Sequence, residues 1–149
     1  MSKITRKCIS YADFGRLMDQ LVERLKQEKF THIYGPARGA WPIATHLSNY
    51  FVETKLIEQL DKSAVASGEV KATKILVVDD VCDSGETLKN VSNKMQKLGY
   101  NFLTAVLHTK PRRSIDPDIY LEEVSNDIWL NYPWEKSDAE INKDYMFKK

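Results

Sequence analysis

The chain has 149 residues, and its 22 Lys and Arg side chains nearly balance its 21 Asp and Glu side chains. We expect residues 1–149 to form one domain, because a chain of this length buries roughly two-thirds of the surface that it exposes when unfolded. The balanced charge excludes a strong overall field, so neither nucleic acid nor a membrane is an expected partner.

The cysteines and the apolar segments indicate the compartment. Cys8 and Cys82 form no CxxC pair, and no Cys/His cluster has the spacing of a metal site, so free thiols in a reducing compartment are expected. No apolar run has the length of a membrane span, and the N-terminus has no apolar core of a secretory signal. The expected location is therefore the cytoplasm.

Helical and strand patterns alternate along the chain. Ser10 with Asp13 is typical of a capping box, Pro42 suits the first turn of a helix, and Gly99 suits a helix end. The expected elements are a helix from Ser10 to about Lys29, a strand at 31–34, a helix from Pro42 to about Tyr50, strands at 51–58 and 75–78, a helix that ends at Gly99 and a strand at 102–108. This alternation predicts an α/β fold, a mainly parallel, doubly wound sheet flanked by helices.

Two polar segments are expected at the surface. Residues 59–73 are mostly polar or small, which is typical of a mobile surface loop. The charged tail after Pro133 is expected to be a solvated appendage.

The strand at 75–78 runs directly into carboxylates. Its four consecutive aliphatic residues are typical of a strand that is covered on both faces. Asp79 and Asp80 follow at once, and Asp83 comes three residues later. Ligands of doubly wound sheets bind beyond the carboxyl ends of the strands. Because adjacent carboxylates repel each other unless something binds them, a ligand site is expected here.

The next residues favour an anion. Ser84, Gly85, Glu86 and Thr87 form a turn that enters a helix, where backbone N–H groups, hydroxyls and the helix dipole suit a phosphate. Asp79 and Asp80 would repel that phosphate, so they should face sugar hydroxyls or a hydrated divalent cation. The alternative is a capped turn with solvated aspartates. The whole arrangement favours a phosphorylated sugar with a metal.

The segment ILVVDDVCDSGET resembles the phosphoribosyl-pyrophosphate (PRPP) motif of the type I phosphoribosyltransferases. The resemblance implies that Asp79 and Asp80 contact the ribose hydroxyls and the shell of a Mg²⁺ cofactor. It also implies that the residues from Asp83 to Thr87 wrap the 5′-phosphate.

A second segment resembles the pyrophosphate loop of that family. Ala37, Arg38 and Gly39 stand where the family often has Ser-Arg-Gly, and Ala40 replaces a second glycine. The resemblance implies that these residues bind PRPP, and Arg38 is a multidentate cation suited to pyrophosphate.

Two further segments, HTKPRRS and NDIWLNYPWE, resemble the xanthine-guanine branch. By this resemblance Lys110 donates to the 6-oxo oxygen of a purine, Trp129 stacks on the base, and Leu130 contacts its edge through the backbone. The implied activity is transfer of phosphoribosyl from PRPP to guanine, xanthine or hypoxanthine in purine salvage. Asp83, Lys110 and Arg38 are the implied catalytic residues, a small C-terminal hood covers the base, and a homo-oligomer (dimer or tetramer) is expected.

The expected lid is short, since only 40 residues lie between Arg38 and Asp79. We therefore leave open whether Lys55, Lys62 or Lys71 helps to hold pyrophosphate. A PRPP-binding regulator with the same fold and little transferase activity is the main alternative. A phosphorylation-switch receiver lacks an aspartate between the acidic loop and Lys110, and a P-loop hydrolase lacks GxxxxGK[ST].

Other polar residues near these motifs are assigned no role. Arg112 and Arg113 are expected to be solvated, His108 is expected to be a packed or surface side chain, and nothing around Cys82 indicates a nucleophile.

Overall fold

The structure is a computed structural model, and it describes residues 4–135. Its helices and strands, in chain order, are β1 (Thr5–Cys8), α1 (Tyr11–Leu25), β2 (His32–Tyr34), α2 (Trp41–Tyr50), β3 (Lys55–Ile57), β4 (Lys74–Cys82), α3 (Glu86–Leu98), β5 (Asn101–Thr109), β6 (Ile119–Glu123) and β7 (Ile128–Asn131). Short 3₁₀ helices cover Arg38–Ala40 and Ser67–Ala72.

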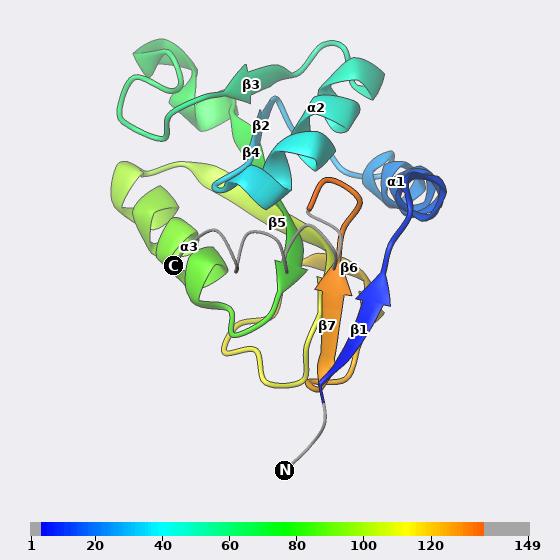
Figure 1. The fold of residues 1–149 in the computed structure, drawn as a ribbon. Coiled ribbons are helices and arrows are strands. Elements are labelled where there is room, and N and C mark those ends of the chain that lie inside the picture. Colours follow the sequence, from blue (N-terminus) through cyan, green and yellow to red (C-terminus); the bar gives the residue numbers. More distant parts are fainter. Residues whose placement is uncertain (1–3, 136–149) are drawn as a thin grey trace, which may run out of the picture.

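Five parallel strands form the central sheet in the order β3-β2-β4-β5-β6. A separate two-stranded sheet pairs β1 in parallel with β7, and Figure 1 shows it beyond the carboxyl end of the central strands. The parallel α/β sheet confirms the predicted fold class. Since the strands run in one direction, every loop at their carboxyl ends lies along one edge.

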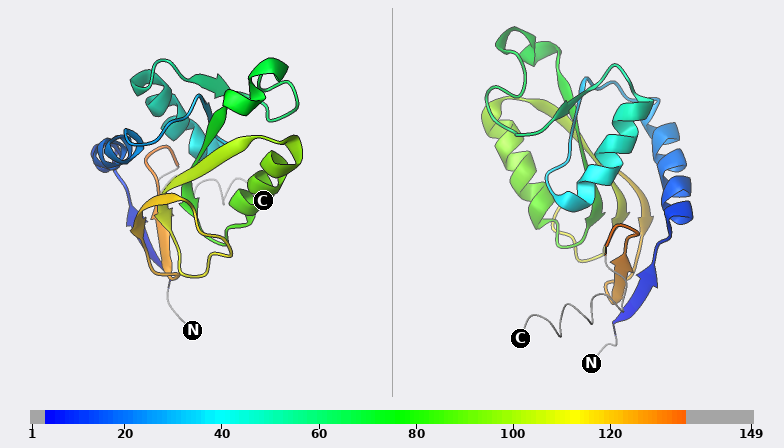
Figure 2. Two further views of the ribbon diagram at one scale, coloured as in Figure 1. Left: turned by 180° about the vertical axis from the view of Figure 1, so that it is seen from behind. Right: turned by 45° about the horizontal axis from the view of Figure 1, so that its top comes forward.

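Side chains of β4 alternate between two hydrophobic clusters. Leu76 and Val78 pack with α1 and α2, whereas Ile75 and Val77 pack with α3. The two views in Figure 2 show these helices on opposite sides of the sheet. Because the side chains of residues 75–78 are all buried, the strand is covered on both faces, as its unbroken aliphatic run predicts.

The predicted helix-end signals at Ser10, Pro42 and Gly99 are confirmed, but α1 ends at Leu25, four residues before the predicted end near Lys29. The Ser10 hydroxyl accepts from the Asp13 N–H, the Asp13 carboxylate accepts from the Ser10 N–H, and Pro42 lies in the first turn of α2. Gly99 follows α3 in the left-handed region, with φ of 77°, where glycine avoids the strain of a Cβ.

Several strand predictions need correction. The strand expected at 51–58 covers only Lys55–Ile57, because Thr54 closes a turn by donating to the Phe51 carbonyl. β1, β6 and β7 carry no strong strand pattern and were not predicted. β4 extends past Val78 to Cys82, so Asp79 and Asp80 are strand residues rather than loop residues.

The segment 59–73 is packed, so the prediction of a mobile surface loop is wrong in part. Leu60 and Val65 are buried in the cluster that α3 covers. The Tyr100 hydroxyl also donates to the Asp61 carbonyl at 2.7 Å. Apolar residues spaced five apart gave no helical or strand period, and this is why the sequence did not reveal their burial.

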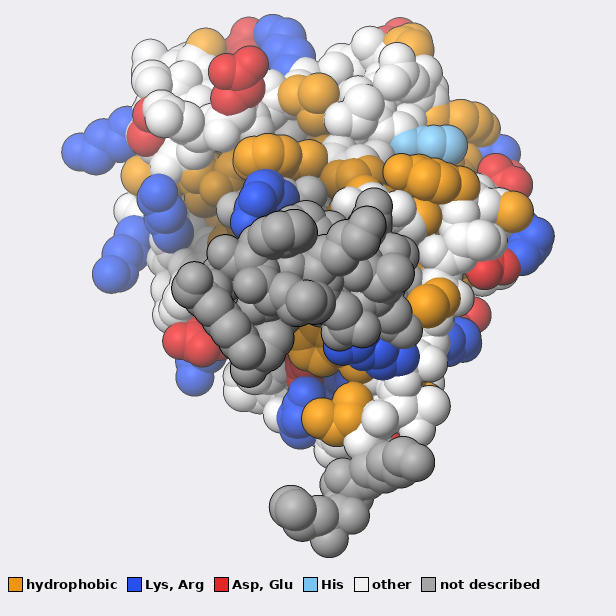
Figure 3. All heavy atoms as spheres, in the orientation of Figure 1, with side chains coloured by type: hydrophobic (Ala, Val, Ile, Leu, Met, Phe, Trp, Pro, Cys, Tyr) orange, Lys and Arg blue, Asp and Glu red, His pale blue; other side chains and the backbone are white. Residues whose placement is uncertain are grey.

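The surface carries charges of both signs. On the face shown in Figure 3, acidic and basic side chains are scattered among apolar ones. Across residues 4–135, no helix has the length and apolar character needed to cross a membrane. Both cysteines are free, Cys8 exposed and Cys82 buried. From residue 136 on, the predicted solvated tail lies outside the described residues.

Candidate functional site

Asp79 and Asp80 are consecutive residues of β4, and the Asp80 N–H donates to Asp79 Oδ1 at 2.9 Å. Asp79 is buried on the side of α3, and its side chain is 9% exposed. Burial, and next the neighbouring charge of Asp80, raise the pKa of Asp79 to about 8. The two carboxylates therefore carry fewer than two negative charges at pH 7 unless a cation joins them.

Asp80 lies against the segment that resembles the pyrophosphate loop. A Cβ added at Gly39 would lie 2.3 Å from Asp80 Oδ2, so only glycine permits this approach. The other oxygen, Asp80 Oδ1, accepts from the Val81 N–H at 2.8 Å. The fold thus brings the acidic strand end beside Arg38–Ala40, which the sequence separates by about 40 residues.

The close approach of Gly39 to Asp80 can be tested by substitution. Gly39→Ala should push the Asp80 carboxylate out of place and weaken PRPP binding about tenfold, while the free energy of unfolding changes little. Calorimetric titration with PRPP and Mg²⁺ measures the first effect, and urea unfolding measures the second. Gly68→Ala is the matched control, because a Cβ at Gly68 meets no atom within 4 Å. Unchanged PRPP affinity in Gly39→Ala would contradict the assigned role of this contact.

The predicted phosphate turn precedes α3. Gly85 has φ of 85°, and a Cβ there would lie 2.9 Å from Ile115 and 3.0 Å from the Ser114 hydroxyl. The Glu86 N–H lies 3.3 Å from the Ser84 hydroxyl, which accepts from it. A small cavity of about 90 Å³ lies here between Asp79, Val106 and residues 81–88. The turn therefore presents backbone N–H groups at a helix N-terminus, as the anion prediction requires.

The residues assigned to the purine meet around a second cavity of about 210 Å³. Asp83 comes from the turn after β4, Lys110 from the end of β5, and Trp129 with Leu130 from β7. The cavity is lined by Val81, Asp83, Lys110, Ile128, Trp129, Leu130, Tyr132 and Glu135. The structure therefore brings together the three residues that the sequence assigned to the purine and Asp83, which it assigned to PRPP and to catalysis.

The side chains of this cavity differ in exposure. Lys110 is 3% exposed, and its ammonium donates to the Ile128 carbonyl. Trp129 is 51% exposed and lines the cavity. A core role for Trp129 is therefore excluded, and its indole is accessible for stacking. β7, which carries Trp129, is fixed by pairing with β1, so the hood over the cavity includes the N-terminal strand.

Arg112 is exposed, as expected, but it is also ion-paired, and the expectation that Arg113 is solvated is wrong. The Arg112 guanidinium binds both oxygens of Asp83, with 2.9 Å between Nη2 and Oδ2. Arg113 is 17% exposed and binds Asp116 and Glu123. Two adjacent arginines after Lys-Pro have no periodicity that distinguishes paired from solvated side chains, so the sequence carried no signal for these contacts.

A buried series of hydrogen bonds was also not predicted from the sequence. The Tyr132 hydroxyl lies 2.7 Å from His108 Nδ1 and 3.1 Å from the Asp80 carbonyl. His108 is 1% exposed, which confirms that it is a packed histidine. These hydrogen bonds connect the segment after β7 with the acidic end of β4.

None of the three candidate lid lysines is brought to the carboxyl edge of the sheet. Lys55 is the first residue of β3. Lys71 lines a cavity with Lys74 and Asn101, which begin β4 and β5 at the opposite edge. Lys62 follows Asp61, whose carbonyl accepts from Tyr100, the residue before β5. The described residues therefore include no lysine from the 59–73 segment near Asp79 and Asp80.

The parallel sheet, with an acidic strand end and a turn at a helix N-terminus, defines a doubly wound α/β protein with a candidate ligand site beyond the carboxyl ends of its strands. Residues 1–141 match the profile of the family described as "Phosphoribosyl transferase domain". The chain belongs to this family, as its PRPP-like motif predicts.

Curated relatives are xanthine-guanine phosphoribosyltransferases. The protein of Ruegeria sp. (strain TM1040) is 31% identical over 83 residues, 56% of this chain and 43% of the relative. That of Cereibacter sphaeroides (strain ATCC 17025 / ATH 2.4.3) is 38% identical over 61 residues, 41% of this chain and 34% of the relative. The chain thus spans less than half the length of these two relatives.

Solved structures match over nearly the whole chain. The purine phosphoribosyltransferase of Pyrococcus horikoshii Ot3 has a TM-score of 0.75 at 28% identity, covering 90% of this chain and 96% of that one. The xanthine-guanine-hypoxanthine phosphoribosyltransferase of Helicobacter pylori has a TM-score of 0.72 at 22% identity, covering 93% and 99%. The second likeness concerns the fold alone. Both agree with the predicted type I architecture.

Proposed function

We propose that the protein transfers phosphoribosyl from PRPP to a 6-oxopurine, guanine, xanthine or hypoxanthine, and releases pyrophosphate in purine salvage. The observation that carries the proposal is the meeting of two half-sites at one sheet edge. Asp79, Asp80 and the turn at 83–87 form the first, and the cavity with Lys110 and Trp129 forms the second. Substrates held side by side react as if at high local concentration.

We propose Mg²⁺ as the cofactor, bound with PRPP. The donor set fits, because Mg²⁺ in substrate sites takes one or two carboxylates and fills its shell with water and phosphate oxygens. Residues 4–135 offer no cluster of three or more His, Cys, Asp or Glu that would hold a metal alone. Asp79 and Asp80 would hold the ion. Burial of Asp79, and next its repulsion by Asp80, raise the pKa of Asp79, and a cation would relieve both effects. Bound Mg²⁺ would supply charge neutralisation on the leaving diphosphate.

The chain's own residues support departure of the diphosphate. As the bond from ribose C1 to pyrophosphate breaks, negative charge grows on the leaving group. The Arg38 guanidinium and the backbone of Ala37 and Gly39 would bind that group. Ser84, Gly85, Glu86 and Thr87 would meanwhile fix the 5′-phosphate through backbone N–H groups and hydroxyls.

The second half-site would select and orient the base. The Lys110 ammonium would donate to the 6-oxo oxygen, and the Leu130 backbone would contact the purine edge. Asp83 would accept a hydrogen bond from the imidazole N–H of the purine. Trp129 would stack on the ring, as its exposed indole permits.

Trp129→Ala should lose about 1 to 3 kcal/mol of base binding, by analogy with base–aromatic stacking elsewhere. PRPP affinity and the free energy of unfolding should hardly change, because the side chain is half exposed. Fluorescence titration with guanine in the presence of PRPP measures the loss. Tyr11→Ala, which removes an exposed aromatic residue on α1, is the control. Unchanged base affinity in Trp129→Ala would contradict the stacking role.

Initial rates with PRPP and each of guanine, xanthine, hypoxanthine and adenine test the function itself, with and without EDTA. The main alternative is a PRPP-binding regulator, and the distance of all three candidate lid lysines from the acidic strand end favours it. Turnover of a 6-oxopurine supports the transferase. PRPP binding without turnover of any base supports the regulator. We also propose that the protein forms a homo-oligomer, in which a basic side chain of a partner subunit takes the place of the lid lysine at the pyrophosphate.

A further inference from the structure

The Asp83 carboxylate is held by a two-pronged contact. Arg112 Nε and Nη2 each donate to a different oxygen of Asp83. Such fork-to-fork pairing fixes the plane of the carboxylate as well as its position, which a lysine ammonium does not do. The Arg112 side chain is 50% exposed and that of Asp83 is 35% exposed. The pair therefore lies at the mouth of the site rather than in the core.

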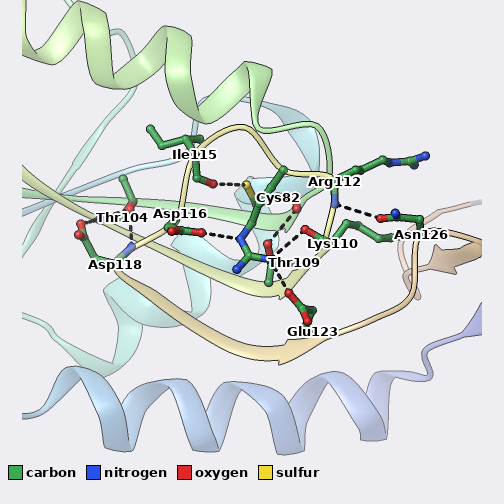
Figure 4. A network of polar contacts seen from close by, with 11 residues as sticks. Cys82, Thr104, Thr109, Lys110, Arg112, Ile115, Asp116, Asp118, Glu123 and Asn126 are labelled. Atoms are coloured by element: carbon green, nitrogen blue, oxygen red, sulfur yellow. Dashed lines mark hydrogen bonds and ion pairs between the residues drawn. The ribbon is translucent and has the colours of Figure 1, made fainter.

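The backbone around Arg112 is fixed by neighbours that have other partners. The Arg112 N–H donates to the Asn126 side chain at 3.1 Å, and the Ser114 N–H donates to the Ser84 carbonyl at 2.8 Å. Arg113 donates to the Lys110 carbonyl at 3.0 Å and binds Asp116 and Glu123. Figure 4 shows the Arg112 side chain extending away from the cluster that contains Asp116 and Glu123. Arg113 thus braces the segment, and this leaves Arg112 to contact Asp83.

We propose that Arg112 is a positioning residue, which holds the Asp83 carboxylate toward the purine cavity so that Asp83 receives the imidazole N–H of the base as a fixed anion. The proposal rests on the transferase function proposed above and refines the part that Asp83 plays in it. The PRPP-like motif does not include Arg112. The segment HTKPRRS of the base-site resemblance contains Arg112, but the resemblance assigns it no role.

Carboxylate chemistry leaves room for both partners. An ionised carboxylate offers about four lone-pair sites, and a bidentate guanidinium uses two of them. The remaining two sites can accept an N–H from the side of the cavity that Asp83 shares with Lys110 and Trp129. Arg112 and the purine therefore need not compete for the same lone pairs.

The charges around Asp83 favour its anionic form. The hydrogen bond from Arg112 is the first cause that lowers the pKa of Asp83, and the positive charge of Lys110 adds to it. The other carboxylates near Asp83 are Glu135, which lines the purine cavity, and Asp79 and Glu86, which line the phosphate cavity. A carboxylate with a lowered pKa is a weak base. Asp83 can therefore accept the hydrogen bond from the purine N–H without removing the proton before the new bond to ribose forms.

The lone pair of purine N9 forms the bond to ribose C1 while the bond from C1 to pyrophosphate breaks. The base gains positive charge, which the Asp83 anion stabilises across the N7–H hydrogen bond. The N7 proton passes through Asp83 to water after the new bond has formed, and the nucleotide product is neutral at the base.

Arg112→Gln tests the proposal, because it removes both the charge and the fork. At saturating PRPP, we expect kcat for the preferred 6-oxopurine to fall at least tenfold, while PRPP affinity stays within about twofold. The acid limb of the kcat/KM profile should move to higher pH. Arg112→Lys keeps the charge and should recover part of kcat. Arg16→Gln is the matched control, because it breaks an exposed arginine–aspartate pair on α1.

A second readout does not depend on turnover. Titration of the ¹³C carboxyl resonance of Asp83 should show a higher pKa in Arg112→Gln than in the wild type. If Arg112→Gln leaves kcat, the pH profile and this titration unchanged, the positioning role is wrong. Loss of thermal stability and PRPP affinity with an unchanged pH profile would overturn it in favour of a purely structural clamp. If the wild type transfers to no base but the titration shifts, the proposed function fails while Arg112 still positions Asp83.

Discussion

Replacing Asp79 and Asp80 together by asparagine should lower the affinity for PRPP with Mg²⁺ about 100-fold or more, roughly 2.7 kcal/mol at 1.4 kcal/mol per decade. Neutral amides keep the shape of both side chains but cannot bind a cation as carboxylates do. Calorimetric titration with PRPP, with and without Mg²⁺, measures the change. Asp19→Asn, on the exposed side of α1, is the control for loss of a negative charge. Unchanged affinity in the double variant would overturn the PRPP half of the proposed site.

Asp79→Asn, which is part of the double variant that should weaken ligand binding, should instead increase the free energy of unfolding at alkaline pH. The pKa of Asp79 is about 8 in the folded protein, against 3.8 for the unperturbed group. The unfolded chain therefore releases this proton first, and the contribution of Asp79 to stability declines as pH rises from about 4 through about 8. Asp79→Asn removes that decline. Its stability relative to wild type should be greater at pH 9 than at pH 5 by about 4 kcal/mol, because about three pKa units of the shift act between these pH values at 1.36 kcal/mol per unit.

Urea unfolding at pH 5 and pH 9, in the absence of Mg²⁺ and PRPP, measures this difference. The Asp79→Asn side chain retains the oxygen that accepts from the Asp80 N–H at 2.9 Å, so the backbone contact survives. An equal stability difference at the two pH values would mean that Asp79 is ionised in the folded protein. Gain of stability with loss of ligand affinity is typical of a residue kept for its chemistry.

Local sequence predicted the parts of the site that one segment forms by itself. The aliphatic run of β4, the turn at Gly85 and the start of α3 are encoded by residues within 20 positions of one another. The capping box at Ser10 is local in the same sense. Such features depend on hydrophobic period and turn chemistry, which single-sequence reasoning can follow.

Contacts between distant segments were beyond that reasoning. β1 is four exposed residues, TRKC, and its strand geometry comes from pairing with β7 more than 120 residues later. The bond from Arg112 to Asp83 spans 29 positions, and the one from Tyr132 to the Asp80 carbonyl spans 52. Each side chain would also be stable in water, so no local cost forces the pairing. The segment likeness that assigned Lys110 and Trp129 to one ligand carries such long-range information implicitly, and the structure places both residues around one cavity.

We expect Lys110 to decide which bases the proposed enzyme accepts. Its ammonium is 3% exposed and has three donors, one of which goes to the Ile128 carbonyl. The others are available to the cavity that Lys110 lines. A 6-oxo oxygen accepts such a donor, whereas the 6-amino group of adenine presents a second donor, and an unpaired polar group in a closed site costs about 1 to 3 kcal/mol. The wild type should therefore use 6-oxopurines and reject adenine.

Lys110→Met removes the donors and keeps most of the side-chain length, so kcat/KM for 6-oxopurines should fall tenfold or more, about 1.4 kcal/mol per decade. PRPP affinity should stay near normal, since Lys110 lines the purine cavity and not the phosphate cavity. The Ile128 carbonyl loses its donor, so a modest loss of stability, about 1 kcal/mol, should accompany the kinetic effect. Lys89→Met, at an exposed position on α3, controls for removal of a positive charge. Efficient adenine turnover by the wild type, or unchanged 6-oxopurine kinetics in Lys110→Met, would contradict a role of this lysine in base selection. A buried ammonium that only supports the Ile128 carbonyl would change stability without changing which purine reacts.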